Sequence, residues 1–237
     1  MINKLNPYFE NKYTLFLLKK YIYTVIVEFF LTKLTFIYRK ILNLKKKIQF
    51  IKKLSFLYNK KLNLITVREN YKLHTEDFIK NLFLQFTEVS GDKSLMNDTA
   101  VVVGFGLIQR KSICVIGIEK GFSLNDKMRR NFGSAKPEGY RKILRTTILA
   151  EKFNLPVLFL IDTPGAYPGI ESEERHISLT ISNNIKNMGF LRVPTLSVVL
   201  SEGGSGGALS IGVTDYILML QYSYYSVISP EGCSTIL

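Results

Sequence analysis

Two glycine-rich segments carry the residues best suited to chemistry in this chain of 237 residues. They are residues 162–169, with the sequence DTPGAYPG, and residues 202–208, with the sequence EGGSGGA. Glycine has no Cβ and tolerates positive φ, so such a segment lets main-chain N–H groups approach a ligand. Each segment can therefore hold negative charge at its backbone.

The familiar nucleotide-binding motifs do not fit these segments. No Gly-Lys-Ser/Thr sequence follows for a P-loop, and Gly104-Phe105-Gly106 leads to Gln109 where a dinucleotide fingerprint needs glycine. Residues 203–207 match the pattern Gly-x-Ser-x-Gly of a nucleophile elbow, but no histidine follows Ser205 in the chain. A serine nucleophile is therefore disfavoured.

Two interpretations of the glycines stay open at this point. In one, backbone N–H groups form an oxyanion hole that stabilises charge developing on a carbonyl oxygen, an effect worth about 3 to 4 kcal/mol per donor. In the other, the glycines only permit tight packing of a strand against the helix that follows it. Spacing alone favours neither.

Apolar runs predict the strands that would position both segments. Residues 100–108 and 113–118 are rich in β-formers and predict a hairpin. Residues 156–161 and 193–200 are almost wholly apolar, which is typical of strands covered on both faces, and each run leads into one glycine segment. The remaining strand candidates are residues 216–220 and 224–228.

Helical periodicity appears between these strands. Residues 138–153 place four apolar side chains on one face of a helix: Tyr140, Ile143, Leu144 and Ile148. Residues 173–188 open among acidic residues that suit the positive end of a helix dipole, and Gly189 suits a C-terminal cap. Ser229-Pro230-Glu231 suits the start of another helix.

The composition favours a folded protein whose excess of basic residues is confined to one segment. Hydrophobic residues make up 46% of the chain, charged residues 22%, and the net charge is +13. Residues 1–65 hold 14 lysines and arginines against Glu10 and Glu28, a balance of +12. Their bias toward Ile, Phe, Tyr, Asn and Lys suits an AT-rich genome, and we favour this interpretation over a nucleic-acid-binding arm. We expect residues 1–65 to form a basic helical segment and residues 66–237 to form the main domain.

Neither a membrane span nor a metal site is predicted. Residues 14–32 are apolar, but three charged residues interrupt them, so a peripheral helix is favoured over a span and no targeting signal is recognised. Cys114 and Cys233 lack partners at metal-ligand spacing and are expected to be reduced packing residues. With His74 and His176 as the two histidines, no zinc site is expected in this chain.

Five blocks of sequence carry a family resemblance. They are residues 129–133 (RRNFG), 137–142 (PEGYRK), 162–169, 202–208 and 221–233. In their order and spacing they resemble the alpha subunit of bacterial and plastid acetyl-CoA carboxylase carboxyltransferase, from about Ile65 to Leu237. The resemblance implies an α/β fold of the crotonase-like (ClpP/crotonase) class, a spiral of ββα units.

The resemblance also implies a transferase chemistry and its partners. Carboxybiotin, held on a biotin carboxyl carrier protein and not attached to this chain, would donate a carboxyl group to acetyl-CoA and give malonyl-CoA for fatty acid synthesis. A beta subunit would carry a zinc ribbon and much of the acetyl-CoA site in an alpha2beta2 assembly. Biotin carboxylase is a further expected partner, and no nucleic acid is expected.

The resemblance assigns site residues by position. Gly206 and Gly207, with Ala208 as a lesser candidate, are assigned as main-chain donors facing the biotin ureido oxygen. The residues assigned to the biotin-binding walls are Gly165, Ala166, Tyr167, Pro168, Gly169, Gly203 and Gly204.

Four charged residues in or near these blocks receive structural rather than catalytic interpretations. Arg129 and Arg130 are interpreted as a solvated basic turn rather than as contacts to a coenzyme A phosphate. Glu173 and Glu174 are interpreted as favouring a helix N-terminus rather than as a base.

The chain also departs from the family pattern. Where the family has Gly-His-Gln-Lys-Gly, residues 117–121 are Gly-Ile-Glu-Lys-Gly, so the family histidine is absent at Ile118. The family continues beyond Cys233, which makes the chain a fragment or a shortened subunit. The alternatives are a self-contained crotonase-type acyl-CoA hydratase, isomerase or decarboxylase, and a non-catalytic scaffold subunit. The expected location is a plastid stroma or a bacterial cytoplasm.

Overall fold

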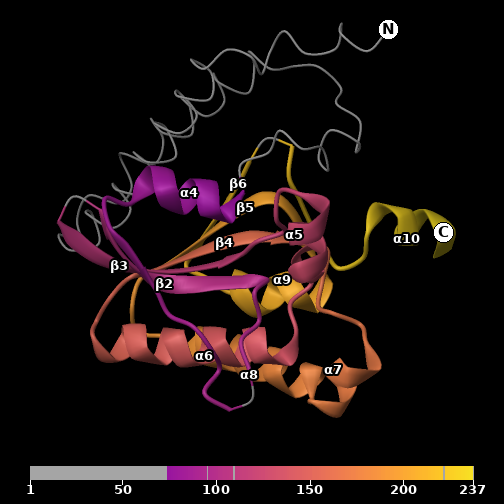
Figure 1. The fold of residues 1–237 in the computed structure, drawn as a ribbon, viewed down its shortest axis with the longest axis horizontal. Helices are drawn as coiled ribbons and strands as arrows, with labels where there is room; N and C mark the ends of the chain where they lie inside the picture. The colour runs from indigo at the N-terminus through magenta and orange to yellow at the C-terminus, as the bar shows by residue number, and fades with distance from the viewer. Residues whose placement is uncertain (1–73, 95, 109, 221, 237) are drawn as a thin grey trace, which may run out of the picture. The chain divides into compact units, whose positions relative to one another are not determined.

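The computed structural model describes residues 74–94, 96–108, 110–220 and 222–236 (Figure 1). Three predictions lie outside these residues: the basic helical segment 1–65, the peripheral helix over residues 14–32, and the domain boundary at residue 65. The described residues lie in one compact unit. None of the described helices is both long and apolar enough to cross a membrane.

A sheet of seven strands forms the centre of this unit. Its order is β1-β2-β3-β4-β5-β6, and β7 also pairs with β5. The strands up to β3 pair antiparallel, and from β3 onward the pairs are parallel. The strand bounds are β1 (Phe86–Glu88), β2 (Val101–Ile108), β3 (Lys111–Ile118), β4 (Val157–Thr163), β5 (Thr195–Gly204), β6 (Tyr216–Met219) and β7 (Tyr224–Ser226).

Helices cover both faces of the sheet. Figure 1 shows α6, α8 and α9 along one face and α4 on the other. The helix bounds are α4 (Thr75–Leu82), α5 (Leu124–Arg129), the 3-10 turn η2 (Asn131–Gly133), α6 (Pro137–Lys152), α7 (Ile170–Glu174), α8 (Ile177–Phe190), α9 (Ser205–Gly212) and α10 (Pro230–Ile236).

The predicted hairpin is confirmed. Strands β2 and β3 pair antiparallel from Val101 opposite Ile118 to Ile108 opposite Lys111. Cys114 is fully buried in this hairpin, as expected for a packing residue, and burial raises the pKa of its thiol. Cys233 is partly buried, and neither cysteine forms a disulfide.

The predicted helix over residues 138–153 forms as α6, with one side chain misplaced. Pro137 occupies the first turn, Glu138 lies at the positive end of the dipole, and Tyr140 and Ile143 are fully buried. Ile148, which was predicted on the core face, is 52% exposed. At 3.6 residues per turn it lies about 80° around the helix from Tyr140, beyond the buried face.

The predicted helix over residues 173–188 is wrong in its extent. The structure has two helices there, because His176 adopts the left-handed conformation (φ 62°) between α7 and α8. Gly189 is not the cap: it lies inside α8, which ends one residue later and continues into Leu191 at φ −60° and ψ 127°. The rest of this stretch follows the predicted helical pattern, with Ile177 and Met188 buried.

Strand β5 is longer than predicted. The prediction ended the strand at residue 200, before the glycine segment, but β5 continues to Gly204 and α9 starts at Ser205. The extension is paired on both sides, because β7 pairs with β5 from Glu202 to Gly204 and Thr163 of β4 pairs with Gly203. The glycine segment is therefore a strand end joined directly to a helix.

The core lies between the sheet and the layer of α6, α8 and α9. Phe159 and Ile161 of β4 pack there with Tyr140 of α6 and Ala208 and Ile211 of α9, all fully buried. This packing fixes the start of α9 against the ends of β4 and β5. Four elements were not predicted: α4, β1, α5 and η2.

Candidate active site

Both glycine segments lie at the carboxyl ends of neighbouring strands. Strands β4 and β5 are parallel, and Thr163 at the end of β4 pairs with Gly203 near the end of β5. Because parallel strands end at the same edge of a sheet, the residues that follow them meet there, at the position where α/β sheets bind ligands. The structure thus brings the two predicted segments together.

The segments are in direct backbone contact. A Cβ on Gly204 would overlap the carbonyl oxygen of Pro164. A Cβ on Gly207 would lie 2.6 Å from the amide nitrogen of Ala166 and 2.7 Å from the carbonyl carbon of Gly165. Residues 204 and 207 are therefore glycine because there is no room for a side chain between the two segments.

The Thr163 side chain fixes the first segment through hydrogen bonds. Its buried hydroxyl lies 2.7 Å from the Gly133 carbonyl oxygen and 2.9 Å from that of Gly165, and it accepts a hydrogen bond of 3.0 Å from the Gly165 N–H. Gly165 itself has φ 145°, a backbone conformation that side chains disfavour. The hydroxyl thus ties η2 and the first segment to the end of β4.

The second segment forms the amino-terminal turn of α9. No side chain of the described residues caps this helix, whose N-cap is Gly204. The N–H groups of the first three residues of a helix, here 205–207, have no acceptor within it, whereas the fourth residue, Ala208, is the first that does. The geometry therefore suits Gly206 and Gly207 as donors better than Ala208, and the helix dipole adds positive potential at this turn.

Ser205 has part of the geometry of a nucleophile but not its partner. It is exposed and has φ 53° at a sharp strand-to-helix turn, as a nucleophile elbow requires. His74 instead lies 3.1 Å from Glu119 through its Nδ1 atom, and His176 joins α7 to α8. In the described chain no hydrogen bond joins Ser205 to either histidine, which agrees with the sequence argument against a serine nucleophile.

A buried charged cluster underlies both segments. The Lys120 ammonium lies 3.0 Å from Asp162 Oδ1 and also contacts Glu202 Oε1, and Tyr224 donates a hydrogen bond of 2.7 Å to Glu202 Oε2. Asp162 and Glu202 are almost fully buried. Sequence reasoning missed this cluster, although a signal was present: each glycine segment begins with a carboxylate at the end of an apolar strand.

Tyr140 lies behind the α9 turn. Its side chain is fully buried, burial raises the pKa of its phenol, and its hydroxyl would lie 2.9 Å from a Cβ on Gly207. The sequence placed Tyr140 on a core-facing helix but gave no sign of this contact. The phenol therefore backs the turn rather than facing solvent.

The remaining predicted binding residues occupy the rim of the segments. Tyr167 is partly buried beneath the Lys136 ammonium, which lies 4.8 Å from the ring centroid, while Pro168 is exposed and Gly169 is the N-cap of α7. Gly203 lies inside the β5 ladder, where a Cβ would be 2.6 Å from the Tyr225 ring. The first segment thus presents its side chains at the edge, and Gly203 has a packing role.

Arg130 corrects the interpretation of residues 129 and 130 as a solvated turn. It is 8% exposed, and its guanidinium contacts Asp126 at 3.0 Å and Glu76 at 2.6 Å. Hydrogen bonds from Arg129 and Arg130 lower the pKa of Asp126 to about 2. Arg130 thus joins the end of α5 to α4, while Arg129 is exposed and pairs with Asp126 within α5.

Three other predicted positions, Ile118, Glu173 and Glu174, lie outside the two segments. Ile118 is fully buried in the core, while Lys120, two residues further on, reaches the charged cluster. Glu173 and Glu174 are exposed in the short helix α7. No group of three potential metal-binding side chains occurs in the part of the chain that the structure describes.

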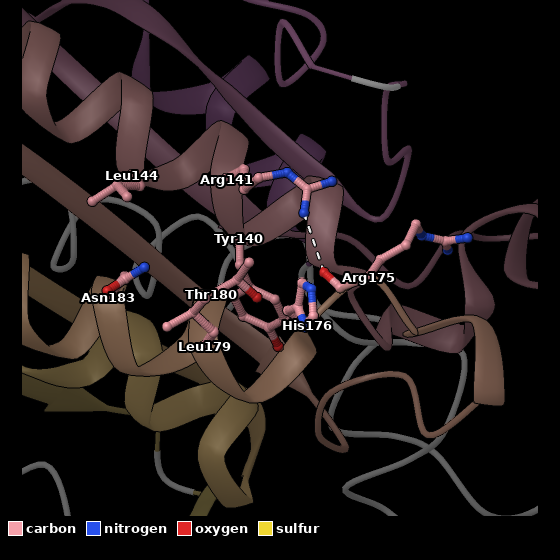
Figure 2. A pocket seen from close by; sticks show the side chains of 8 residues that line it. All are labelled: Tyr140, Arg141, Leu144, Arg175, His176, Leu179, Thr180 and Asn183. Atoms are coloured by element: carbon pink, nitrogen blue, oxygen red, sulfur yellow. Dashed lines mark hydrogen bonds between the residues drawn. The ribbon is translucent and has the colours of Figure 1, made fainter. Parts of the chain in front are cut away.

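A surface pocket of roughly 310 Å³ lies between α6 and α8, and Figure 2 shows its lining. Its arginines are already engaged: Arg141 binds Asp92 at 2.8 Å and the Arg175 carbonyl oxygen at 3.4 Å, and Arg175 lies 2.6 Å from Glu138. The lining residues are Tyr140, Arg141, Leu144, Arg175, His176, Leu179, Thr180 and Asn183. None of the predicted site residues is among them.

Comparisons with known proteins agree with this arrangement. Residues 18–237 match the family described as "Acetyl co-enzyme A carboxylase carboxyltransferase-like". The expected start of the resemblance near Ile65 was therefore wrong, because the match begins at residue 18. This range includes all five of the blocks.

Curated relatives carry the name acetyl-coenzyme A carboxylase carboxyl transferase subunit alpha. The protein of Pasteurella multocida (strain Pm70) is 53% identical over 164 residues, which is 69% of this chain and 52% of the relative. That of Blochmanniella floridana is 48% identical over 202 residues, 85% of this chain and 63% of the relative. The chain thus spans about half the length of several relatives that it matches, among them the one from Vibrio cholerae (strain N16961), at 53%.

Solved structures of similar fold are carboxylases and a transcarboxylase. The transcarboxylase 12S structure with hydrolysed methylmalonyl-coenzyme A bound has a TM-score of 0.61 at 18% identity, over 76% of this chain and 35% of that one. The beta subunit of Pseudomonas aeruginosa geranyl-CoA carboxylase has a TM-score of 0.53 at 23% identity, over 64% of this chain and 27% of that one. These likenesses confirm the predicted fold class, a crotonase-like α/β arrangement.

Proposed function

The chain belongs to the family of acetyl-coenzyme A carboxylase carboxyltransferase alpha subunits, and from this premise we propose that it forms, with a beta subunit, a carboxyltransferase that converts acetyl-CoA to malonyl-CoA for fatty acid synthesis. The observation that supports it most is the contact between the two glycine segments. It fixes the position of the amino-terminal turn of α9, which has no side-chain cap, at the edge of the sheet where α/β folds bind ligands.

The proposed role of the α9 turn is to stabilise a developing oxyanion. Its uncapped N–H groups, above all those of Gly206 and Gly207, would donate to oxygen atoms of the reacting groups, in a position fixed by the rigid contact with residues 164–166. Preorganised donors of this kind need no acidic or basic side chain beside them. Residues 165–169 would form the opposing wall, with the half-buried Tyr167 at its rim.

Biotin on a carrier protein is the cofactor that the family implies, and the site's donor set fits it. Biotin supplies the carboxyl group and the base when it is bound. The chain's own contribution would be hydrogen-bond donation from the α9 turn, which suits a ureido or enolate oxygen, and exclusion of water by the packed glycine segments. No residue of this chain is needed as the base.

The proposed partners follow from the subunit name of the relatives. We propose a beta subunit that completes the acetyl-CoA site in an alpha2beta2 assembly, a biotin carboxyl carrier protein, and biotin carboxylase. The relatives named above are bacterial, which supports a bacterial cytoplasm over a plastid stroma as the location.

Malonyl-CoA-dependent carboxylation of free biotin, the reverse half-reaction, tests this function. We expect activity with the chain plus a beta subunit, none with the chain alone, and none with Gly207→Val plus the beta subunit. Gly189→Val is the matched control, because no atom lies within 4 Å of a Cβ there, and it should keep activity.

Two outcomes would contradict the proposal. Activity of the chain alone on an acyl-CoA, without biotin, would show a self-contained crotonase-type enzyme. A stable complex with the beta subunit that shows no activity would leave a scaffold subunit.

A further inference from the structure

Lys120 contacts two buried carboxylates that belong to different strands. It follows the end of β3, and its ammonium contacts Asp162 of β4 at 3.0 Å and Glu202 of β5. The Lys120 side chain is 15% exposed, Asp162 is 1% exposed and Glu202 6%. One cation therefore joins three neighbouring strand ends.

The two carboxylates are the first residues of the two glycine segments. Asp162 is followed by Thr163-Pro164-Gly165, and Glu202 is followed by Gly203 and Gly204. Neighbouring buried carboxylates repel each other, and this repulsion acts on the spacing of β4 and β5 where the segments begin. A cation between the two carboxylates attracts both of them and so draws the two strand ends together.

Other contacts lock the cluster in place. The Glu202 N–H donates to Asp162 Oδ1 at 3.4 Å, and the Tyr224 hydroxyl holds the second oxygen of Glu202. The β4–β5 register shifts between Ile161 and Thr163, which is the position of Asp162. The ladder is irregular at this point, so side-chain contacts have more influence on the strand spacing there.

The η2 turn covers the lysine stem. A Cβ on Gly133 would lie 2.7 Å from Lys120 Cγ and 3.0 Å from the Asp162 carbonyl oxygen. The Gly133 carbonyl oxygen contacts the Thr163 hydroxyl that holds the first segment. The cluster and the first segment therefore share one support.

We propose that Lys120 is a positioning residue for the carboxyltransferase reaction: by joining Asp162 to Glu202, it sets the distance between residues 164–166 and the α9 turn. Its ammonium is held by both carboxylates, so it acts through them and not as a base. This inference rests on the function proposed above. It names a determinant of the donor geometry that lies outside both glycine segments.

Kinetics of the reverse half-reaction with the beta subunit test the proposal. Lys120→Met should lower kcat about 100-fold, the effect of a displacement of about 1 Å, with the KM for malonyl-CoA changed by no more than about threefold. Lys120→Arg should lower kcat about tenfold or less, because a guanidinium can still join both carboxylates. The double variant Lys120→Met with Glu202→Gln should have a kcat about tenfold higher than Lys120→Met alone, because Glu202→Gln removes one of the two like charges.

Lys80→Met is the matched control, since Lys80 is an exposed lysine paired with Glu76 at 3.5 Å. It should leave kcat unchanged. A kcat of Lys120→Met within threefold of the wild-type value would overturn the proposal, as would failure of Glu202→Gln to recover any activity.

Amide hydrogen exchange of the full chain tests the same inference without activity. In Lys120→Met, the amides of residues 165–167 and of Ala208, the first amide of α9 that has an acceptor within the helix, should exchange faster, while those of β2 and β3 should not change. If Lys120→Met fails to fold, Lys120→Arg and the double variant give the same comparison. If the wild-type pair is inactive but exchange in Lys120→Met changes only in the two segments, the proposed function is wrong, whereas the link that Lys120 makes between the segments stands. Unchanged exchange in Lys120→Met would contradict that link itself.

Discussion

The two glycine segments meet at one edge of the sheet, but they need glycine for different reasons. In the first, Gly165 has φ 145° and ample space, since a Cβ there would be 3.9 Å from its nearest neighbours. In the second, Gly204 has an ordinary φ of −96° and no space at all beside Pro164. The first segment needs a backbone that only glycine adopts easily, and the second needs room.

This difference assigns separate roles to the segments. The first is a shaped loop held by the Thr163 hydroxyl, while the second is a strand end and helix start held by packing. The residue with strained φ in the second segment is Ser205, at φ 53°, and not a glycine. A substitution that adds a Cβ should therefore cause a steric clash at Gly204 in the second segment and backbone strain at Gly165 in the first.

Gly204→Ala should have the largest effect on stability. Its Cβ would overlap the Pro164 carbonyl group and force the segments apart, which should cost about 3 kcal/mol of unfolding free energy. Gly206→Ala is the control, because its Cβ would meet only Ile181, at 3.7 Å, and alanine stabilises a helix by about 0.5–1 kcal/mol over glycine. Urea unfolding measures the stability of both variants. Equal losses of unfolding free energy would contradict the claim that residue 204 is glycine for lack of space.

Gly165→Ala should cost about 2 kcal/mol, through backbone strain and not through a clash. Thermal unfolding of the variant measures the cost. A stability equal to the wild type would mean that the first segment does not depend on its glycine conformation, and the contrast between the segments would fail.

Thr163→Val should cost about 1 kcal/mol. Valine keeps the shape of the side chain but removes the hydroxyl that contacts Gly133 and Gly165. Amide exchange should then speed up at residues 165–167 and stay unchanged in α9. Faster exchange in α9 as well would show that the hydroxyl supports both segments.

Ser205→Gly should have the smallest effect, a stability change of at most about 1 kcal/mol, in the stabilising direction. Glycine adopts φ 53° without strain. Activity of the pair in the reverse half-reaction should be retained. Loss of that activity in a folded variant would instead support a serine nucleophile.

Apolar periodicity predicted the elements that carry the site. Residues 156–161 and 193–200 were predicted as strands and form most of β4 and β5, and the predicted helix 138–153 is α6. Buried strands and amphipathic helices can be recognised from the apolar periodicity of short windows of sequence. The break at His176 was not visible, since a left-handed residue depends on the packing of α7 and α8 around it. The extension of β5 pairs with β7, which is 20 residues further along the chain.

The glycine residues of the candidate site could be located from the sequence, but the contacts that position them could not. The glycine pattern located residues 165–169 and 203–208, while the reasons for individual glycines required the contacts between segments. Asp162 and Glu202 lie in β4 and β5 and Lys120 follows the end of β3, so no local pattern could join them. The resemblance gave Ala208 as a lesser donor candidate, and the start of α9 places it fourth in the helix.

The most direct test of the account replaces the peptide bond between Ser205 and Gly206 by an ester, which removes the Gly206 N–H and changes no side chain. We expect kcat of the chain paired with a beta subunit to fall about 100-fold or more, with little change in the KM for malonyl-CoA or in thermal stability. The same replacement at Gly189, in the last turn of α8, should cost some stability and leave kcat unchanged. A kcat unaffected by the ester at Gly206 would contradict the claim that this N–H acts on the reacting groups.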